Sequence, residues 1–447
     1  MNKEIVKIII ILLLIPSCSI MPLKPMKDQD PLFGEKKKTN NETKEEILKK
    51  DKTQKLFISE KPINDELNPK LQINLENSFI NSKRKNNLDN NAGRHDFDGE
   101  LTKKLNYKFS KISNFYQNEP KPIFFENDLI FFNKKGSLIR FNESKEKVWI
   151  SNNYTKTEKK SKPFLYLAKN QNILIVADSI SKFYALNIIN GDLIWEKNNS
   201  SSFNSEIKIY KDKFFVTDSQ NTLHCFSIKD GREIWSHKTE NTLIKSEKKL
   251  SIIINNNVVY FNNSIGDVTA LNVQKGNLIW QLPTLHNNIY AESLSLKSSD
   301  LVLDKKIIYF SNNKNEFYAI EANSGILRWK TKINSAMRPK IIGNAIITIT
   351  QNGFLIILDK VSGNIIRITD IFDKFKEKKR SQIYPVGFVV GVKKIYLTTT
   401  NGRLLIIDIK TGKNEKIMKI DGDKISKPFI NKNKLFIIKD KAIIRFN

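Results

Sequence analysis

The sequence predicts an all-β protein, an eight-bladed β-propeller whose blades are four-stranded antiparallel sheets. Two observations lead to this prediction. One phrase recurs along the chain, and its copies follow one another at about 40 to 50 residues, a period typical of propeller blades. Every Trp of the chain stands at one place in that phrase: Trp149, Trp195, Trp235, Trp280 and Trp329.

A second hairpin precedes each copy of the phrase. Apolar runs rich in Ile, Val, Phe and Tyr break at polar or Gly positions and then resume, as in residues 173–186 and 345–358. This pattern predicts a strand, a tight turn and another strand. A further short apolar run lies upstream, as in residues 121–125. Each blade is therefore expected to be a meander of four strands, called A, B, C and D in chain order.

The strand count predicts how the ring closes. Strands A, B and C occur eight times, whereas strand D of the recurring phrase occurs seven times. A blade without its outer strand would leave an unpaired edge. We therefore expect a strand near residues 105–112 to complete the last blade, and we assign residues 101–447 to the propeller.

The recurring Gly and Trp are expected to have separate structural roles. The Gly lies in the turn between strands C and D, where a left-handed backbone costs other residues about 1–2 kcal/mol. The Trp ring on strand D can cover the seam between neighbouring blades. Arg367 and Lys416 replace Trp in the last two copies, which indicates repeat decay, a looser sector or a contact surface. The turn glycines are Gly191, Gly231, Gly276, Gly325, Gly363 and Gly412.

Residues 1–17 have the pattern of a lipoprotein signal peptide. Lys3 and Lys7 precede an apolar core at residues 8–15, which is much shorter than the roughly 20 residues that span a bilayer. A small residue, Ser17, stands directly before Cys18, so Cys18 is the expected site of lipidation. Several acyl chains on one residue would anchor the protein stably to a membrane.

Residues 18–100 are expected to form a lipidated, disordered tether. They are rich in Lys, Asn, Glu and Asp, contain few aromatic residues and show no period. Such a segment cannot bury enough apolar surface to offset the entropy of the chain. Short apolar clusters at residues 56–58 and 71–75 are either docking motifs or incidental.

The repeat phrase, which reads Ala-x-Asx-x-x-x-Gly-x-x-x-Trp in its fullest form, resembles that of the PQQ-like repeat family. The resemblance covers residues 121–447. For an exported lipoprotein it implies a non-catalytic scaffold in the machinery that assembles outer-membrane β-barrel proteins. It also implies partners, namely the central barrel subunit of that complex and unfolded outer-membrane protein precursors. By similarity to bacterial lipoproteins, Ser19 after the lipidated Cys favours the outer membrane, with the propeller facing the periplasm.

The chain is strongly basic. Its net charge is +28, and about +26 of this lies on the propeller, because the signal region and the tether contribute about +1 each. A basic excess can indicate nucleic-acid binding, but export argues against nucleic acid as a partner. Compositional drift explains the charge, unless a basic face attracts anionic lipid or acidic proteins. With Cys18 acylated, Cys225 has no partner for an intramolecular disulfide.

Two other functions compete with the scaffold. A quinone-dependent dehydrogenase of the same family would bind pyrroloquinoline quinone and Ca²⁺ over the propeller axis. That chemistry uses an adjacent Cys pair, which this sequence lacks. A ligand-sensing periplasmic propeller is supported by the fold alone. The sequence therefore predicts a protein that is not an enzyme and has no catalytic, cofactor-binding or metal-binding residues.

Overall fold

The computed structural model of the protein describes residues 73, 93–102, 104–111, 120–240, 249–284 and 296–447. All of these residues belong to the second of the two compact units of the chain, Pro62–Asn447. The signal peptide, Cys18 and most of the predicted tether lie outside the described residues.

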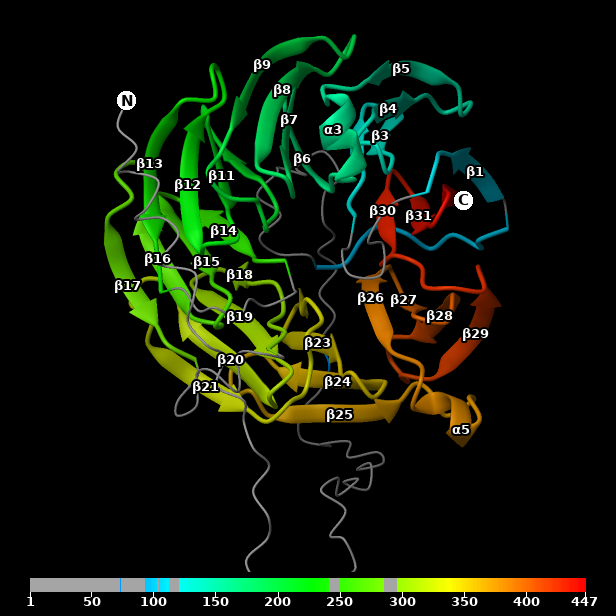
Figure 1. The fold of residues 1–447 in the computed structure, drawn as a ribbon. Helices are drawn as coiled ribbons and strands as arrows, with labels where there is room; N and C mark the ends of the chain where they lie inside the picture. Colours follow the sequence, from blue (N-terminus) through cyan, green and yellow to red (C-terminus); the bar gives the residue numbers. More distant parts are fainter. Residues whose placement is uncertain (1–72, 74–92, 103, 112–119, 241–248, 285–295) are drawn as a thin grey trace, which may run out of the picture. The chain divides into compact units, whose positions relative to one another are not determined.

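The described residues form eight four-stranded antiparallel sheets, which confirms the predicted eight-bladed β-propeller (Figure 1). Blades 1 to 4 consist of β2 (Ile123–Phe125), β3 (Asp128–Phe132), β4 (Leu138–Phe141) and β5 (Lys147–Ser151); β6 (Leu165–Asn170), β7 (Ile173–Asp178), β8 (Lys182–Asn187) and β9 (Leu193–Asn198); β10 (Lys208–Tyr210), β11 (Lys213–Thr217), β12 (Thr222–Ser227) and β13 (Glu233–Lys238); and β14 (Ile252–Asn255), β15 (Val258–Asn262), β16 (Val268–Asn272) and β17 (Leu278–Leu282).

The remaining blades repeat this order. Blades 5 to 8 consist of β18 (Val302–Asp304), β19 (Ile307–Asn312), β20 (Glu316–Glu321) and β21 (Leu327–Thr331); β22 (Lys340–Ile342), β23 (Ala345–Ile349), β24 (Phe354–Asp359) and β25 (Ile365–Asp370); β26 (Pro385–Val390), β27 (Lys394–Thr399), β28 (Arg403–Asp408) and β29 (Asn414–Lys419); and β30 (Phe429–Asn431), β31 (Lys434–Lys439), β32 (Ala442–Phe446) and β1 (Lys104–Lys108).

Burial rises from the outer strand of each blade to its middle strands. The middle strands, such as β7 and β8, are buried along almost their whole length, because neighbouring blades cover both faces. This explains why strands B and C read as continuous apolar runs. Strand D, such as β9, is exposed at most positions and forms the outer edge of the blade (Figure 1). Strand A lies nearest the axis of the propeller.

The eighth blade joins the two ends of the propeller. β1 pairs with β32 in antiparallel register from Lys104 opposite Phe446 to Lys108 opposite Ala442. Tyr107 of β1 is buried, and its hydroxyl accepts a hydrogen bond of 2.9 Å from Arg445. The strand overlaps the window at 105–112 in which the sequence predicts a closing strand.

The propeller unit begins before residue 101, where the sequence places the boundary. The Arg94 guanidinium donates a hydrogen bond of 3.0 Å to the carbonyl of Val392, and the Phe97 ring lies edge-on at 5.2 Å from the ring of Tyr396. Phe97 is 2% exposed. Arg94 and Phe97, which the sequence assigns to the tether, therefore lie against blade 7.

The described helices are the short segments α3 (Lys156–Lys160) and α5 (Glu377–Arg380). None of the helices in the described part of the chain has the length and apolar character needed to cross a membrane.

Candidate functional sites

Each Trp of the repeat binds the next blade rather than its own. The indole Nε1 donates a hydrogen bond across the seam to a main-chain carbonyl in the C–D turn of the following blade. The pairs are Trp149 with Ile188 at 3.1 Å, Trp195 with Ile228 at 2.9 Å, Trp235 with Val273 at 3.0 Å, Trp280 with Ala322 at 2.9 Å and Trp329 with Lys360 at 3.3 Å. The same type of hydrogen bond therefore recurs at five seams between neighbouring blades.

The Gly of that turn lies directly against the same ring. A Cβ on Gly231 would stand 2.7 Å from the Trp195 ring, and a Cβ on Gly276 would stand 2.6 Å from the Trp235 ring. Both glycines also have positive φ, +67° and +71°. The Gly is thus required for two reasons, the left-handed turn and the close approach of the Trp from the preceding blade.

Arg367 replaces Trp in blade 6 and makes the same kind of contact. Its guanidinium donates to the carbonyls of Ile409 and Lys410 in the C–D turn of blade 7. Ile409 stands at the position that accepts the Trp hydrogen bonds elsewhere in the ring. Arg367 is 8% exposed, whereas Lys416 at the same position of blade 7 is exposed. The seam after blade 6 is therefore not loosened by the loss of Trp.

A β-bulge places apolar side chains on the outer surface. In blades 1 to 7, the pairing of strands C and D shifts by one residue, as between Ala185 and Leu186 of β8, so that Ile194 of β9 has no direct partner. The extra residue interrupts the alternation of strand D, and two successive residues before the Trp face outward. Ile194 and Leu193 are 48% and 47% exposed.

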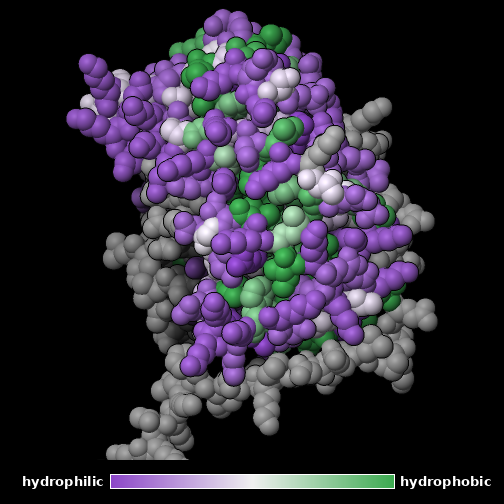
Figure 2. Space-filling model, turned by 90° about the vertical axis from the view of Figure 1, so that its right-hand side faces the viewer, coloured by the Kyte–Doolittle hydropathy of each residue, from purple (hydrophilic) through white to green (hydrophobic). Residues whose placement is uncertain are grey.

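Blades 1 to 5 share this exposed apolar surface, which we call the apolar rim. In blades 6 to 8, no large apolar residue of a described strand D reaches the same exposure. Figure 2 views the side on which β1 and β29 lie in Figure 1, and hydrophilic residues predominate there. The rim residues are Val148, Ile150, Leu193, Ile194, Ile234, Leu278, Ile279 and Leu327.

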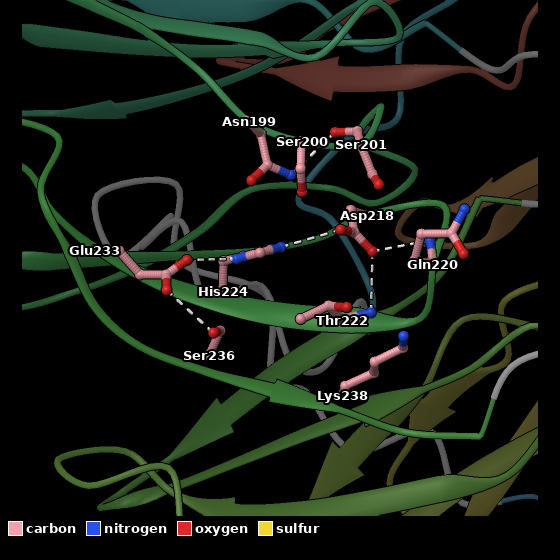
Figure 3. A pocket seen from close by; sticks show the side chains of 10 residues that line it. All are labelled: Asn199, Ser200, Ser201, Asp218, Gln220, Thr222, His224, Glu233, Ser236 and Lys238. Atoms are coloured by element: carbon pink, nitrogen blue, oxygen red, sulfur yellow. Dashed lines mark hydrogen bonds and ion pairs between the residues drawn. The ribbon is translucent and has the colours of Figure 1, made fainter.

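A polar pocket of about 450 Å³ lies in blade 3 beside the loop from blade 2 (Figure 3). The β11–β12 turn, β12 and β13 supply most of its lining, and the loop after β9 supplies the rest. The residues that line it are Asn199, Ser200, Ser201, Asp218, Gln220, Thr222, His224, Glu233, Ser236 and Lys238.

His224 bridges two carboxylates in this pocket. Its Nδ1 lies 2.7 Å from Glu233 and its Nε2 lies 3.1 Å from Asp218. Burial lowers the pKa of His224, but the hydrogen bonds and charges of Asp218 and Glu233 outweigh burial and raise it. Burial acts to raise the pKa of Asp218, yet the hydrogen bond from His224 leaves it lowered. An imidazolium that donates to both carboxylates fits this geometry.

The imidazole of His224 is not placed to act as a base toward a Ser of this pocket. The Ser236 hydroxyl lies 3.0 Å from Glu233 and donates to that carboxylate, while both ring nitrogens of His224 are engaged by carboxylates. Nucleophilic catalysis by a Ser needs a base that can accept its proton. The neighbouring Cys225 is buried, and burial raises the pKa of its thiol to about 12. Asp218 also accepts hydrogen bonds from the main-chain N–H groups of Gln220 and Thr222, so this arrangement stabilises the β11–β12 turn.

No cluster of three or more His, Cys, Asp or Glu side chains within the described ranges is arranged to hold a metal ion. The pocket itself is not predictable from the sequence, because four separate elements bring together residues of ordinary polar types. The rim was open to prediction, because a pair of apolar residues directly precedes Trp195 and Trp280 where strict alternation would place one.

The repeat geometry, with a Trp that reaches the turn of the following blade, defines a β-propeller of the PQQ-like repeat class. The chain belongs to the family described as outer membrane protein assembly factor BamB, whose sequence model matches residues 134–369, more than half of the chain. No protein among those with curated descriptions matches the sequence.

Solved structures with low sequence identity share the fold. BamB from Moraxella catarrhalis superposes with a TM-score of 0.61 at 13% identity, over 77% of this chain and 100% of that one. The computationally designed Ika8 protein gives 0.57 at 10% identity, over 76% and 100%. The C-terminal WD40 domain of Sif2 gives 0.56 at 11% identity, over 79% and 99%. At these identities the likeness concerns the fold alone.

Proposed function

We propose that this protein is a non-catalytic scaffold lipoprotein of the outer-membrane β-barrel assembly machinery. The observation that carries the proposal is membership of the BamB family over residues 134–369. The proposal places the propeller in the periplasm, anchored to the outer membrane through a lipidated Cys18. Its partners are the central barrel subunit of the assembly complex and unfolded precursors of outer-membrane proteins.

The apolar rim supports a binding role. Monomeric soluble proteins expose few contiguous apolar patches, and larger ones commonly mark contact sites. Here one or two exposed apolar residues recur close to the Trp position in each of blades 1 to 5, so a partner can contact several blades at once. Ile194 and Ile279 are such residues of blades 2 and 4, and they are 48% and 47% exposed.

The edge of strand D supports a second, more limited contact. An extended segment can add to a sheet edge through main-chain hydrogen bonds. The bulge before each Trp interrupts the edge, and bulges limit uncontrolled pairing of edges. Strand addition to blade 2 is therefore expected only beyond the bulge, along Trp195–Asn198.

Affinity purification of the lipidated protein from detergent-solubilised envelopes tests the proposal. We expect the central barrel subunit to be recovered and identified by mass spectrometry. Loss of Cys18 by Cys18→Ala should release the protein into the soluble periplasmic fraction. Absence of the barrel subunit from the wild-type eluate, with and without chemical cross-linking, would contradict the scaffold role.

Paired rim variants test the contact surface. Ile194→Asp combined with Ile279→Asp should reduce recovery of the barrel subunit about tenfold, because two apolar contacts become charges that must be desolvated. Val361→Asp is the matched control, since Val361 is 80% exposed but lies in the C–D turn of blade 6, outside the rim. Equal recovery with both proteins would show that the rim is not the contact surface.

A further inference from the structure

Exposed lysines gather at the outer edge of blade 7. Residues 373–380 belong to the loop between β25 and β26, and residues 410–419 form the C–D turn of blade 7 and β29. These two segments, which we call the basic sector, contain nine basic and three acidic residues, a net charge of +6. Its exposed lysines are Lys374, Lys376, Lys378, Lys379, Lys410, Lys413, Lys416 and Lys419.

The general composition of the chain does not account for this density of charge. Lys and Arg make up 75 of the 447 residues of the chain, but they make up nine of the 18 residues of the basic sector. One of the three acidic residues, Glu415, lies 3.1 Å from Lys394 outside the sector. The positive excess is therefore a local feature of this edge.

Hydrogen bonds hold the two segments of the basic sector side by side. The side-chain amide of Asn414 donates to the carbonyl of Ile371 at 2.7 Å, and the ammonium group of Lys374 donates to the carbonyl of Asn414 at 2.8 Å. Arg367 of β25 donates to the carbonyl of Lys410. The loop from blade 6 and the outer strand of blade 7 therefore present their lysines as one surface, and Figure 1 shows α5 beside the outer edge of blade 7.

The basic sector lies across the ring from the apolar rim. Blade 7 is four blades away from blade 3 in either direction around the eight-bladed ring, and β29 and β13 lie at opposite sides of Figure 1. A protein that occupies the rim of blades 1 to 5 therefore leaves the basic sector accessible for a different contact.

The N-terminal part of the chain reaches the propeller at the same blade. Arg94 donates a hydrogen bond of 3.0 Å to the carbonyl of Val392. The carbonyl of the following residue, Lys393, accepts a hydrogen bond of 3.0 Å from the main-chain N–H of Ile409, which directly precedes the basic sector. A lipid anchor on Cys18 is thus joined to the propeller at blade 7, and this step alone rests on the proposed function.

The types of side chain favour a lipid surface over a protein partner. The cores of protein interfaces are enriched in aromatic residues and Arg and depleted in Lys. Both segments of the basic sector are fully described, and neither exposes a large apolar side chain. Their single Arg, Arg380, is engaged by Asp370. Lys is a flexible point charge that needs no fixed partner geometry, which suits the headgroups of a fluid anionic bilayer.

We propose that the basic sector is a docking surface for an anionic phospholipid bilayer. Each Lys close to an anionic surface adds to the attraction, which decays within a Debye length, so only lysines at the outer edge of the molecule contribute. α5 and β29 lie at this edge (Figure 1). Docking there holds the propeller edge-on to the membrane, with the rim of blade 3 on the far side.

Vesicle flotation with residues 19–447 tests the proposal. This chain lacks the lipidated Cys18 and keeps the whole compact unit Pro62–Asn447, so its binding does not depend on the anchor. In about 0.1 M NaCl it should bind phosphatidylglycerol vesicles at least about tenfold more tightly than phosphatidylcholine vesicles. In about 1 M NaCl, where the Debye length falls to about 3 Å, this preference should disappear. Equal binding to the two lipids at low salt would overturn the proposal.

A triple variant locates the contact. Lys376→Gln, Lys378→Gln and Lys379→Gln together should weaken binding to phosphatidylglycerol vesicles about tenfold or more. All three side chains are exposed, and that of Lys376 makes no capping hydrogen bond to α5, so folding should be retained. Unchanged vesicle binding would refute the lipid surface. Loss of a protein partner from this variant, with vesicle binding intact, would assign the basic sector to an acidic protein instead.

A second triple variant is the matched control. It combines Lys197→Gln, Lys229→Gln and Lys275→Gln, which remove the same charge from exposed positions of blades 2, 3 and 4. Vesicle binding should change by less than about twofold, because these residues lie across the ring, beyond a Debye length from a bilayer at blade 7. Equal losses in the two triple variants would show that total charge attracts the lipid and would refute docking at the basic sector. A failure of anchoring at Cys18 would leave all of these results unchanged.

Discussion

The smallest structural unit of this propeller is a Trp and a Gly that belong to different blades. The sequence predicts a turn role for Gly and a seam role for Trp. It does not predict that the Trp of one blade leaves no room for a side chain at the Gly of the next blade. The reason is that the pair, such as Trp195 and Gly231, is separated by about one blade length in the chain. Only the folded propeller shows that the indole of Trp195 lies against the backbone of Gly231.

A double-mutant cycle on Trp195 and Gly231 should reveal this coupling. Gly231→Ala adds a methyl group 2.7 Å from the Trp195 ring at a φ of +67°. We expect it to lower the free energy of unfolding by more than the roughly 1–2 kcal/mol of the backbone conformation alone. In a Trp195→Leu background the additional cost should fall, giving a coupling of about 0.5–3 kcal/mol in urea denaturation.

Gly422→Ala is the control for this cycle. No atom lies within 4 Å of a Cβ at Gly422, and its φ is not in the left-handed region. The substitution should change stability by less than about 0.5 kcal/mol. If the two glycine variants were equally stable, the close approach of the Trp ring would have no energetic weight.

His224 should make stability depend on pH. Its pKa in the folded protein is raised above the ordinary value of 6.5, so the stabilisation is fully present below about pH 6.5 and is lost as the pH rises through the folded pKa. His224→Gln should remove this slope from thermal unfolding measured between pH 6 and 9. The groups that face the imidazole are Asp218, Glu233 and, across the pocket, Lys238.

Asp178 provides an internal comparison at lower pH. Burial raises its pKa to about 6, although hydrogen bonds from Tyr154 and the main chain oppose the shift. A raised carboxyl pKa means that stability is lost as the pH rises from about 4 to about 6. Asp178→Asn should therefore reduce the dependence of stability on pH between about pH 4 and 6 and leave the dependence that His224 causes at higher pH unchanged. If Asp178→Asn and His224→Gln removed the same pH dependence, the assignment of the two effects to two residues would be contradicted.

At the scale of a strand, the sequence predicts strand number and order better than it predicts surfaces. Apolar runs and turn signals locate the B, C and D strands of blades such as that of β19, β20 and β21. The alternation of apolar and polar residues cannot predict the bulge, because the position of the extra residue in strand D is determined by the pairing with strand C. The outward apolar pair before Trp280, Leu278 and Ile279, follows from that pairing.

At the seam after blade 6, Arg367 contacts the next turn in place of Trp, which argues against the alternative of a looser sector there. Arg367→Ala should destabilise the protein by about 1–3 kcal/mol, because two main-chain carbonyls lose a charged donor. Lys416→Ala at the same position of blade 7 is exposed and should change stability by less than about 0.5 kcal/mol. Chemical denaturation of both proteins measures the difference, and equal losses would argue against the inter-blade role of Arg367.

For the whole molecule, counting strands predicts closure, because an open blade has an unpaired edge. The count does not reveal that residues 94–101 also lie against the propeller, since Phe97 and Leu101 are isolated apolar residues in a polar stretch.

Tyr107→Ala should open the ring at blade 8. Tyr107 is 2% exposed and accepts a hydrogen bond from Arg445, so we expect a loss of about 3–5 kcal/mol. Hydrogen exchange should accelerate first in β31 and β32 and least in β19 and β20 on blade 5. Asn106→Ala, at an exposed position of the same strand, should leave exchange unchanged. Uniform acceleration in all blades would indicate global destabilisation without a weak closing blade.

The pairing of β1 with β32 also governs when this chain can mature. β1 is synthesised hundreds of residues before its partner, and it must wait until residues 442–446 have followed. A polypeptide cut short before that point keeps an unpaired strand edge and an unclosed ring. The late synthesis of β32 thus acts as a completeness check on each newly made copy.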